Sequence, residues 1–325
     1  MKAKIIIFIL CFAAVAGGWT NTIDVINHRI MIVNNVIAFS GGEDPWAGFN
    51  FDSAPFPPPS DGCFQVGRVL NNELYRVGGT DASNKGVTNA YKYDGTNWIK
   101  IAALPTPMFI PRGCVFQNKL FVCGGQQAIW SVSTNFYGFD GTNWAYEPAY
   151  PVARFGAALA SYQNRLFGIG GSTGGSESTN VFRFDGTNWT QVAGLPVSSH
   201  FGCAMAYGDY LYYHGTAGEY WTPVTNVFRF DGTNWTQVAG LPAARMQSTM
   251  CVAHDKLLLI GGAPNYGTMD RTTNVFIFDG VSWIETNGVP EAGHTAGDAD
   301  IYNGKIVIQQ GVWGDSGGTN VWTSD

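Results

Sequence analysis

Charged residues are scarce in this chain, and no cluster of basic residues is present. Only 13% of the 325 residues are Asp, Glu, Lys or Arg, and the formal net charge is −6. Nucleic acids and anionic membrane surfaces attract proteins through clustered lysine and arginine side chains. The composition therefore argues against a nucleic-acid partner and against insertion into a membrane. The sequence also contains no motif that predicts a cofactor or a metal site.

Long apolar runs are absent after the first fifteen residues. The chain begins MKAKIIIFILCFAAVAGGW, with Lys2 and Lys4 before the apolar run 5–15 and a small-residue pattern at 14–16. This is the pattern of a secretory signal peptide, and the run is too short for a membrane anchor. We predict a leader at residues 1–16 and an exported, soluble monomer at residues 17–325, secreted or periplasmic.

Cysteine is also infrequent, and five cysteines remain after removal of the leader. An odd number leaves at least one thiol unpaired within the chain. Cys114 and Cys123 flank the segment VFQNKLFV, and a hairpin that turns at Asn118-Lys119 would set them opposite each other. A disulfide bond and a pair of buried free thiols are both compatible with this spacing.

Glycine and aromatic residues are abundant, as is typical of an all-β protein with many turns. The segment NVFRFDGTNWTQVAGLP occurs at 180–196 and again, unchanged, at 226–242. It belongs to a longer repeat of 42 to 48 residues, in which an aromatic strand ends in aspartate: Asp52, Asp94, Asp140, Asp185, Asp231, Asp279 and Asp325. An apolar strand that runs into glycine precedes each aspartate, and Trp98, Trp144, Trp189, Trp235 and Trp283 follow five of them.

Four short strands per unit, with a glycine pair and a later tryptophan, resemble the kelch repeat. The resemblance implies a β-propeller of four-stranded blades. Seven aspartate ends predict seven blades. The chain stops before the last blade could form its fourth strand, and GGWTNTIDV at 17–25 mirrors TNWTQVAG. We therefore predict that residues 18–25 supply that strand and close the ring. The repeated DGTNW segment is predicted to be a structural turn.

Function is predicted on the face that carries the variable loops, because unlike loops on a uniform scaffold are where binding is expected. Fifteen or sixteen residues before the glycine step, four successive repeats carry Arg154, His200, Arg245 and His294, an arc suited to a carboxylate or phosphate. The loops add further candidate ligand-binding residues: Trp130, Glu219, Trp221, Tyr266 and Trp313. The alternative is structural, with the arginines bonded to carbonyls of adjacent blades. Asp298 and Asp300 are inward polar candidates, which we expect neighbouring backbone to satisfy.

Three functions fit this pattern to different degrees. An exported binding protein for a glycan or an extracellular protein needs only the features above. The chain is also similar to exported bacterial kelch proteins, a group that includes sialic-acid mutarotases. That resemblance implies an arginine for the sugar carboxylate and an acid–base carboxylate such as Glu219. A copper oxidase of the galactose-oxidase kind is disfavoured, because the five histidines fall at unrelated repeat positions.

Overall fold

The computed structural model describes residues 21–25, 28–33, 36–40, 51–54, 64–81, 83, 85–128, 131–217, 222–265, 272–286, 288, 295–311 and 321–324. Its regular elements are all strands. The contacts divide the chain into two compact units, Met1–Gly48 and Phe49–Asp325. The predicted leader at 1–16 lies outside the described residues and stays a prediction.

The first unit contains an antiparallel three-stranded sheet of β1 (Asn21–Val25), β2 (His28–Val33) and β3 (Val36–Ser40). Isoleucine and valine, which favour extended backbone, recur in all three strands. β1 pairs with β2 along its whole length, Asn21 with Ile32 through Val25 with His28. The prediction that residues 18–25 complete the last blade is therefore wrong, because β1 has its partner within the first unit.

The second unit consists of antiparallel four-stranded sheets, here called blades 1 to 6. From the innermost strand outward, blade 1 consists of β5 (Val66–Leu70), β6 (Glu73–Val77), β7 (Ala90–Tyr93) and β8 (Trp98–Lys100), and blade 2 of β9 (Arg112–Phe116), β10 (Lys119–Cys123), β13 (Phe136–Phe139) and β14 (Trp144–Tyr146). In the same order, blade 3 consists of β15 (Ala158–Tyr162), β16 (Arg165–Ile169), β17 (Val181–Phe184) and β18 (Trp189–Val192), and blade 4 of β19 (Cys203–Tyr207), β20 (Tyr210–His214), β21 (Val227–Phe230) and β22 (Trp235–Val238). Blade 5 consists of β23 (Thr249–Ala253), β24 (Lys256–Ile260), β25 (Val275–Phe278) and β26 (Trp283–Thr286). A two-stranded hairpin, β11 (Gln126–Ala128) with β12 (Ser131–Val132), lies between β10 and β13.

Blade 6 joins the two ends of the unit. Its strands are β27 (Thr295–Tyr302), β28 (Lys305–Gly311), β29 (Val321–Ser324) and, outermost, β4 (Phe51–Ala54). β4 pairs antiparallel with β29, from Phe51 with Ser324 to Ala54 with Val321. An early strand does complete the last blade, as predicted, but it is the segment around Asp52, which the sequence pattern had assigned to a blade of its own.

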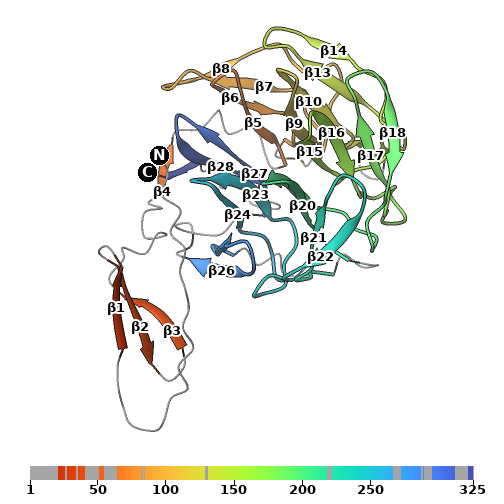
Figure 1. Cartoon of the computed structure of the whole chain (residues 1–325). Coiled ribbons are helices and arrows are strands. Elements are labelled where there is room, and N and C mark those ends of the chain that lie inside the picture. The colour runs from red at the N-terminus through yellow and green to blue at the C-terminus, as the bar shows by residue number, and fades with distance from the viewer. Residues whose placement is uncertain are drawn as a thin grey trace. The chain divides into compact units, whose positions relative to one another are not determined.

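The blades form a closed ring, a β-propeller. The innermost strands contact one another in the cyclic order β5, β9, β15, β19, β23, β27 and back to β5. Figure 1 shows these strands toward the middle of the unit, with β8, β14, β18 and β22 at its periphery. The described residues thus form six four-stranded sheets, five of them from consecutive strands, and the prediction of seven blades is wrong.

The repeated DGTNW segment is a structural turn, as predicted. In each of five blades an aspartate Oδ1 accepts the backbone N–H groups of the residues two and three positions later; in blade 3, Asp185 accepts those of Thr187 and Asn188, both at 2.8 Å. These bonds hold the pKa of Asp185 below its ordinary value. The following tryptophan bonds to the preceding blade, with Trp189 Nε1 donating to the Pro148 carbonyl at 3.0 Å.

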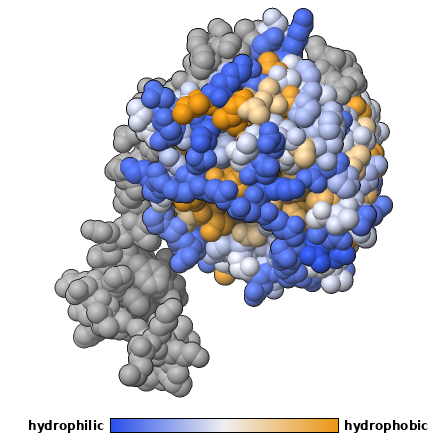
Figure 2. All heavy atoms as spheres, turned by 90° about the horizontal axis from the view of Figure 1, so that it is seen from above, coloured by the Kyte–Doolittle hydropathy of each residue, from blue (hydrophilic) through white to orange (hydrophobic). Residues whose placement is uncertain are grey.

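Apolar side chains fill most of the space between neighbouring blades. Between blades 2 and 3, for example, Phe121 stacks on Phe136, and the edge of Phe184 meets both rings at centroid distances of 5.9 and 5.2 Å. Between blades 6 and 1 the apolar cluster is smaller, with Leu74 and Val307 as its buried members. Polar contacts between β27 and β5 add to the apolar ones at this seam. Figure 2 shows one face of the molecule, on which apolar residues form small groups among hydrophilic ones.

The four described cysteines are free thiols. The hairpin of β9 and β10 pairs Cys114 with Phe121 and Cys123 with Arg112, so the two thiols are not opposite each other as predicted. Burial raises the pKa of both to about 12. Of the two alternatives left open by the spacing, the structure shows the buried free thiols.

The packing of the inner strands makes Gly113 sensitive to any side chain. A methyl group there would overlap the side chain of Val66 on the neighbouring blade. We expect Gly113→Ala to lower the free energy of unfolding by about 1–3 kcal/mol through overpacking. Gly175→Ala is the matched control, because a methyl group there meets nothing within 4 Å. Urea unfolding measures both; equal stability of the two variants would contradict the described packing.

Candidate functional site

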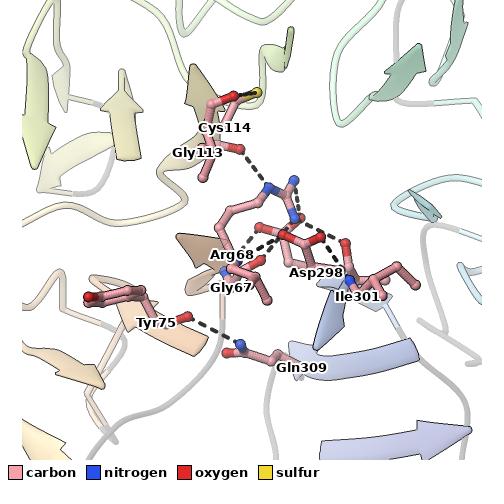
Figure 3. Close-up of polar contacts among 12 residues, drawn as sticks. Gly67, Arg68, Tyr75, Gly113, Cys114, Asp298, Ile301 and Gln309 are labelled. Atoms are coloured by element: carbon pink, nitrogen blue, oxygen red, sulfur yellow. Dashed lines mark hydrogen bonds and ion pairs between the residues drawn. The ribbon is translucent and has the colours of Figure 1, made fainter. Parts of the chain in front are cut away.

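A group of charged side chains lies at the centre of the ring, on the inner strands of blades 1, 2 and 6. We call Arg68, Arg112 and Asp298 the central charge cluster. The Nη2 atom of Arg68 lies 2.6 Å from Asp298 Oδ1, and the other carboxylate oxygen accepts the Gly67 backbone N–H at 3.1 Å. Figure 3 shows Asp298 between Arg68 and the backbone of β5. The carboxylate therefore connects the last blade to the first.

Arg68 extends this connection to blade 2. Its Nε donates to the Gly113 carbonyl at 3.1 Å, and its Nη1 donates to the Gly67 and Ala299 carbonyls at 2.9 and 3.3 Å. Burial lowers the pKa of Arg68, but Asp298 and Asp300 more than offset that effect, so its pKa stays above the ordinary value. One guanidinium thus holds β27, β5 and β9 together.

Asp300 lies two residues after Asp298 on β27 and also connects this strand to the backbone of β5. Its Oδ2 accepts the Val69 backbone N–H at 2.8 Å. The expectation that neighbouring backbone satisfies Asp298 and Asp300 is confirmed, with the addition that Asp298 also forms an ion pair. Burial raises the pKa of Asp298, and Arg68 and Arg112 offset part of that rise.

Arg112 begins β9 and lines a small central cavity beside the Arg68–Asp298 pair. The cavity has a volume of about 20 Å³. Its wall is completed by small or neutral residues of the other inner strands: Ala158, Gly202, Cys203, Ala204, Ser248, Thr249 and Met250. A space of this size admits about one water-sized particle, whereas pockets for drug-sized ligands measure several hundred Å³. In this form the centre of the ring does not accommodate a sugar.

Apolar side chains lie directly before the inner strands, on the side where the variable loops emerge. We call Phe64, Phe109, Phe155, Phe201 and Met246 the mouth cluster; all five are buried. Phe64 and Phe201 have left-handed backbone, with φ of 63° and 48°. Non-glycine residues rarely adopt this conformation, which here turns the chain into the inner strand. The mouth cluster thus packs at the start of the inner strands, which line the central cavity.

Of the predicted arc, Arg154, His200 and Arg245 are described, and both arginines are buried against protein groups. Arg154 is 0% exposed; its Nη1 donates to the Gly170 carbonyl, and its Nε donates to the Val152 carbonyl at 3.3 Å. Arg245 is 2% exposed, and its Nη1 donates to the Gly261 carbonyl and to Thr272 Oγ1, both at 3.0 Å. Both arginines bond backbone carbonyls, as the structural alternative expects, but Gly170 and Gly261 belong to the blade whose inner strand each arginine precedes and not to an adjacent blade.

Arg245 also lies over an aromatic ring, with its Cζ 4.1 Å from the centroid of Phe276. Burial lowers its pKa to about 10. The neighbouring His214 has Nδ1 2.9 Å from the Asn226 carbonyl and Nε2 3.2 Å from the Arg245 carbonyl. Burial lowers the pKa of His214 to about 4, so the imidazole is neutral at pH 7. Blades 4 and 5 are therefore joined at this edge through the backbone of Arg245.

His200 is buried and contacts a carboxylate that the sequence analysis did not single out. Its Nδ1 lies 2.9 Å from Glu177 Oε1 and 3.0 Å from Thr216 Oγ1. Glu177 closes a short hairpin with Ser172, which is also bridged to Phe155. Glu177 Oε2 is buried with no hydrogen-bond partner among the described residues, and the same holds for Arg154 Nη2. We call Arg154, Glu177, His200 and Arg245 the rim group.

The structure leaves the other predicted binding residues untested. Trp130, Glu219, Trp221, Tyr266, His294 and Trp313 lie outside the described residues. The sequence analysis missed Arg68, Arg112 and Glu177. Counting back from the tight turn that follows each inner strand, instead of from the glycine step, would have placed Arg68 and Arg112 on the inner strands. No comparable signal marks Glu177, which sits in a variable loop.

Comparison with known proteins identifies similar solved structures. No family model and no curated protein matches this sequence. A structure titled "Structure of YjhT" is similar to 83% of this chain and 95% of its own, with a TM-score of 0.66 and 16% identity. The fold is a kelch-like β-propeller. At this level of identity the likeness concerns the fold of the propeller and not its activity.

Two further features are absent from the described part of the chain. No group of three or more His, Cys, Asp or Glu side chains in that part is arranged to hold a metal ion. Among the same residues, no helix is long and apolar enough to cross a membrane.

The Arg68–Asp298 pair should make a large contribution to the stability of the propeller. Removing one partner of a buried pair leaves the other charge uncompensated, so we expect Asp298→Ala to lower the free energy of unfolding by about 3–5 kcal/mol. Asp298→Asn, which retains an acceptor for Gly67, should cost less. Asp209→Ala, at an exposed position, is the control. Guanidinium unfolding that gives the same midpoint for Asp298→Ala and Asp209→Ala would disprove the role of this pair.

Proposed function

We propose that this kelch-like propeller is an exported binding protein that recognises a carbohydrate or an extracellular protein with its variable-loop face. The opposite face offers little variety, because five of its turns repeat the same aspartate-centred hydrogen bonds. The loop face carries a different sequence in each blade. Recognition by unlike loops on a rigid scaffold is a common arrangement in binding proteins.

The contact between Glu177 and His200 is the observation that carries this proposal. The hairpin tip Thr173–Ser176 is exposed and closed by a hydrogen bond from the Thr173 N–H to the Ser176 carbonyl at 3.0 Å. Immediately after the tip, Glu177 reaches His200 of the next blade. A loop fixed in this way loses less conformational entropy when a ligand binds. Its hydroxyl groups can exchange hydrogen bonds with a sugar or a polypeptide.

The binding roles predicted for Arg154, His200 and Arg245 stay predictions. All three are buried, and both arginines bond backbone carbonyls, so their removal would disturb the fold together with any site. The exposed hydroxyls of the hairpin tip give a cleaner test, because their removal leaves these contacts in place.

We expect the double variant Thr173→Ala, Ser176→Ala to reduce ligand capture at least about tenfold, as loss of two hydrogen bonds at about 1 kcal/mol each implies. The matched control is Thr187→Ala, Thr233→Ala, which removes two exposed hydroxyls from the constant turns. Capture is measured on a glycan array and on an array of extracellular proteins. Equal effects of the two double variants, or no capture by the wild type on either array, would reject the proposal.

A sugar mutarotase acting on an anionic sugar such as sialic acid is the second candidate. The rim group favours it, because Glu177 provides a buried carboxylate beside an imidazole and Arg154 lies near the same hairpin. Anomer exchange needs an acid–base group, and an arginine suits the carboxylate of the sugar.

NMR exchange spectroscopy of sialic-acid anomers tests this candidate. We expect the wild type to accelerate exchange and Glu177→Gln to lose at least about 100-fold of that acceleration, a typical contribution of acid–base catalysis. Thr187→Ala should retain it. Absence of acceleration by the wild type would eliminate the mutarotase.

A further inference from the structure

We propose that the central cavity is a binding site for one small monovalent anion of the size of chloride, held by Arg112. This site is formed by the inner strands and their first residues and not by the variable loops. It follows from the donors that the central charge cluster leaves unused, from the neutral character of the opposite wall and from the volume of the cavity.

The donors and acceptors of the Arg68–Asp298 pair are already occupied. Nε, Nη1 and Nη2 of Arg68 each have a partner, and both oxygens of Asp298 are bound, one by Arg68 and one by the Gly67 N–H. Asp298 attracts Arg112 from a distance but has no oxygen left for it. The Nε of Arg112 is buried and has no hydrogen-bond partner among the described residues.

An unpartnered guanidinium N–H in a buried position is costly, because it has lost its hydration without gaining an acceptor. Burial lowers the pKa of Arg112, which reflects this incomplete compensation. A monovalent anion in the cavity would supply both the missing acceptor and the missing negative charge.

The wall opposite Arg112 favours an anion over a cation. Ala158, Ala204 and Gly202 are small, and Ser248 and Thr249 are uncharged. Cys203 also lines it, but burial raises its pKa to about 12, so the thiol is neutral and does not compete for Arg112. Asp298 is thus the one carboxylate among the lining residues, and it is already paired.

The volume sets the class of ligand. About 20 Å³ accommodates a single water-sized particle or a monatomic ion, and a sugar, a phosphate ester or a carboxylic acid metabolite needs more space. A single uncompensated arginine matches a single negative charge. Chloride and bromide are therefore the appropriate probes, and gluconate is an anion too large to enter.

Thermal unfolding at constant ionic strength provides the first test, with sodium chloride replaced stepwise by sodium gluconate. A ligand that binds the folded state alone raises Tm, and above its Kd the rise grows with the logarithm of the ligand concentration. We expect the wild type to have a Tm about 2–4 °C higher in chloride, the effect of occupying a site at roughly ten times its Kd in a domain of this size. Equal Tm values in both salts would overturn the proposal.

Variants connect the effect to the cavity. Arg112→Gln should abolish the chloride dependence of Tm, whereas Arg165→Gln, which removes a partly exposed arginine at a turn, should retain it. If Arg112→Gln does not fold, Ala158→Val tests the same site by filling it while leaving every charge in place. Retention of the chloride effect in the folded variants would show that the ion binds elsewhere.

A crystal structure of the wild type grown with sodium bromide gives the direct readout. The anomalous difference map should show a bromide in contact with the guanidinium group of Arg112. A water molecule at that position, or bromide only at exposed surface sites, would overturn the proposal even if Tm responded to salt.

Discussion

The ion pair between Arg68 and Asp298 is the interaction on which the closed ring depends most. Neighbouring blades share no continuous backbone ladder, only isolated bridges such as Ser178 with Ser199, so side chains must also fix each blade against the next. Elsewhere aromatic and aliphatic residues do this by close packing, which sets the distance between blades. Between blades 6 and 1, directional contacts from Asp298 and Asp300 to the backbone of β5 also set the register. The seam between blades 6 and 1 is thus fixed by polar groups as well as by packing.

The sequence predicted the architecture of a single blade well. The turn at Asp185 could be predicted because Asp-Gly and the following N–H groups form a local structure that needs no tertiary partner. The tryptophan at position 189 recurs with the turn, and its bond to the preceding blade repeats at Trp144 and Trp235. A turn or contact that every repeat needs requires the same residues in each repeat, so it can be recognised as a periodic pattern in the sequence.

The number of blades and the closing strand left no such record. Asp52 ends an aromatic segment like the others, but it lacks the DGTNW continuation, and its strand serves blade 6. Local pattern alone does not distinguish a strand that begins a blade from one that completes another. Likewise, the central charge cluster draws Arg68, Arg112 and Asp298 from three blades at unequal positions. The sequence pattern did identify Arg154 and Arg245, because they recur at one position of the repeat. Both bond backbone carbonyls, so their recurrence reflects a structural requirement that these blades share.

The pairing of β4 with β29 has a consequence for how the molecule is made. β4 is the first strand of the propeller to be synthesised and β29 is the last, so blade 6 stays incomplete until nearly the whole chain has left the ribosome. Contacts so distant along the chain form slowly, because the loop between them must first be closed. During that interval β4 lacks its partner and its edges are open to pairing with another strand. Nascent chains therefore pass through a vulnerable stage, during which a chaperone that shields strand edges would increase the yield of folded protein.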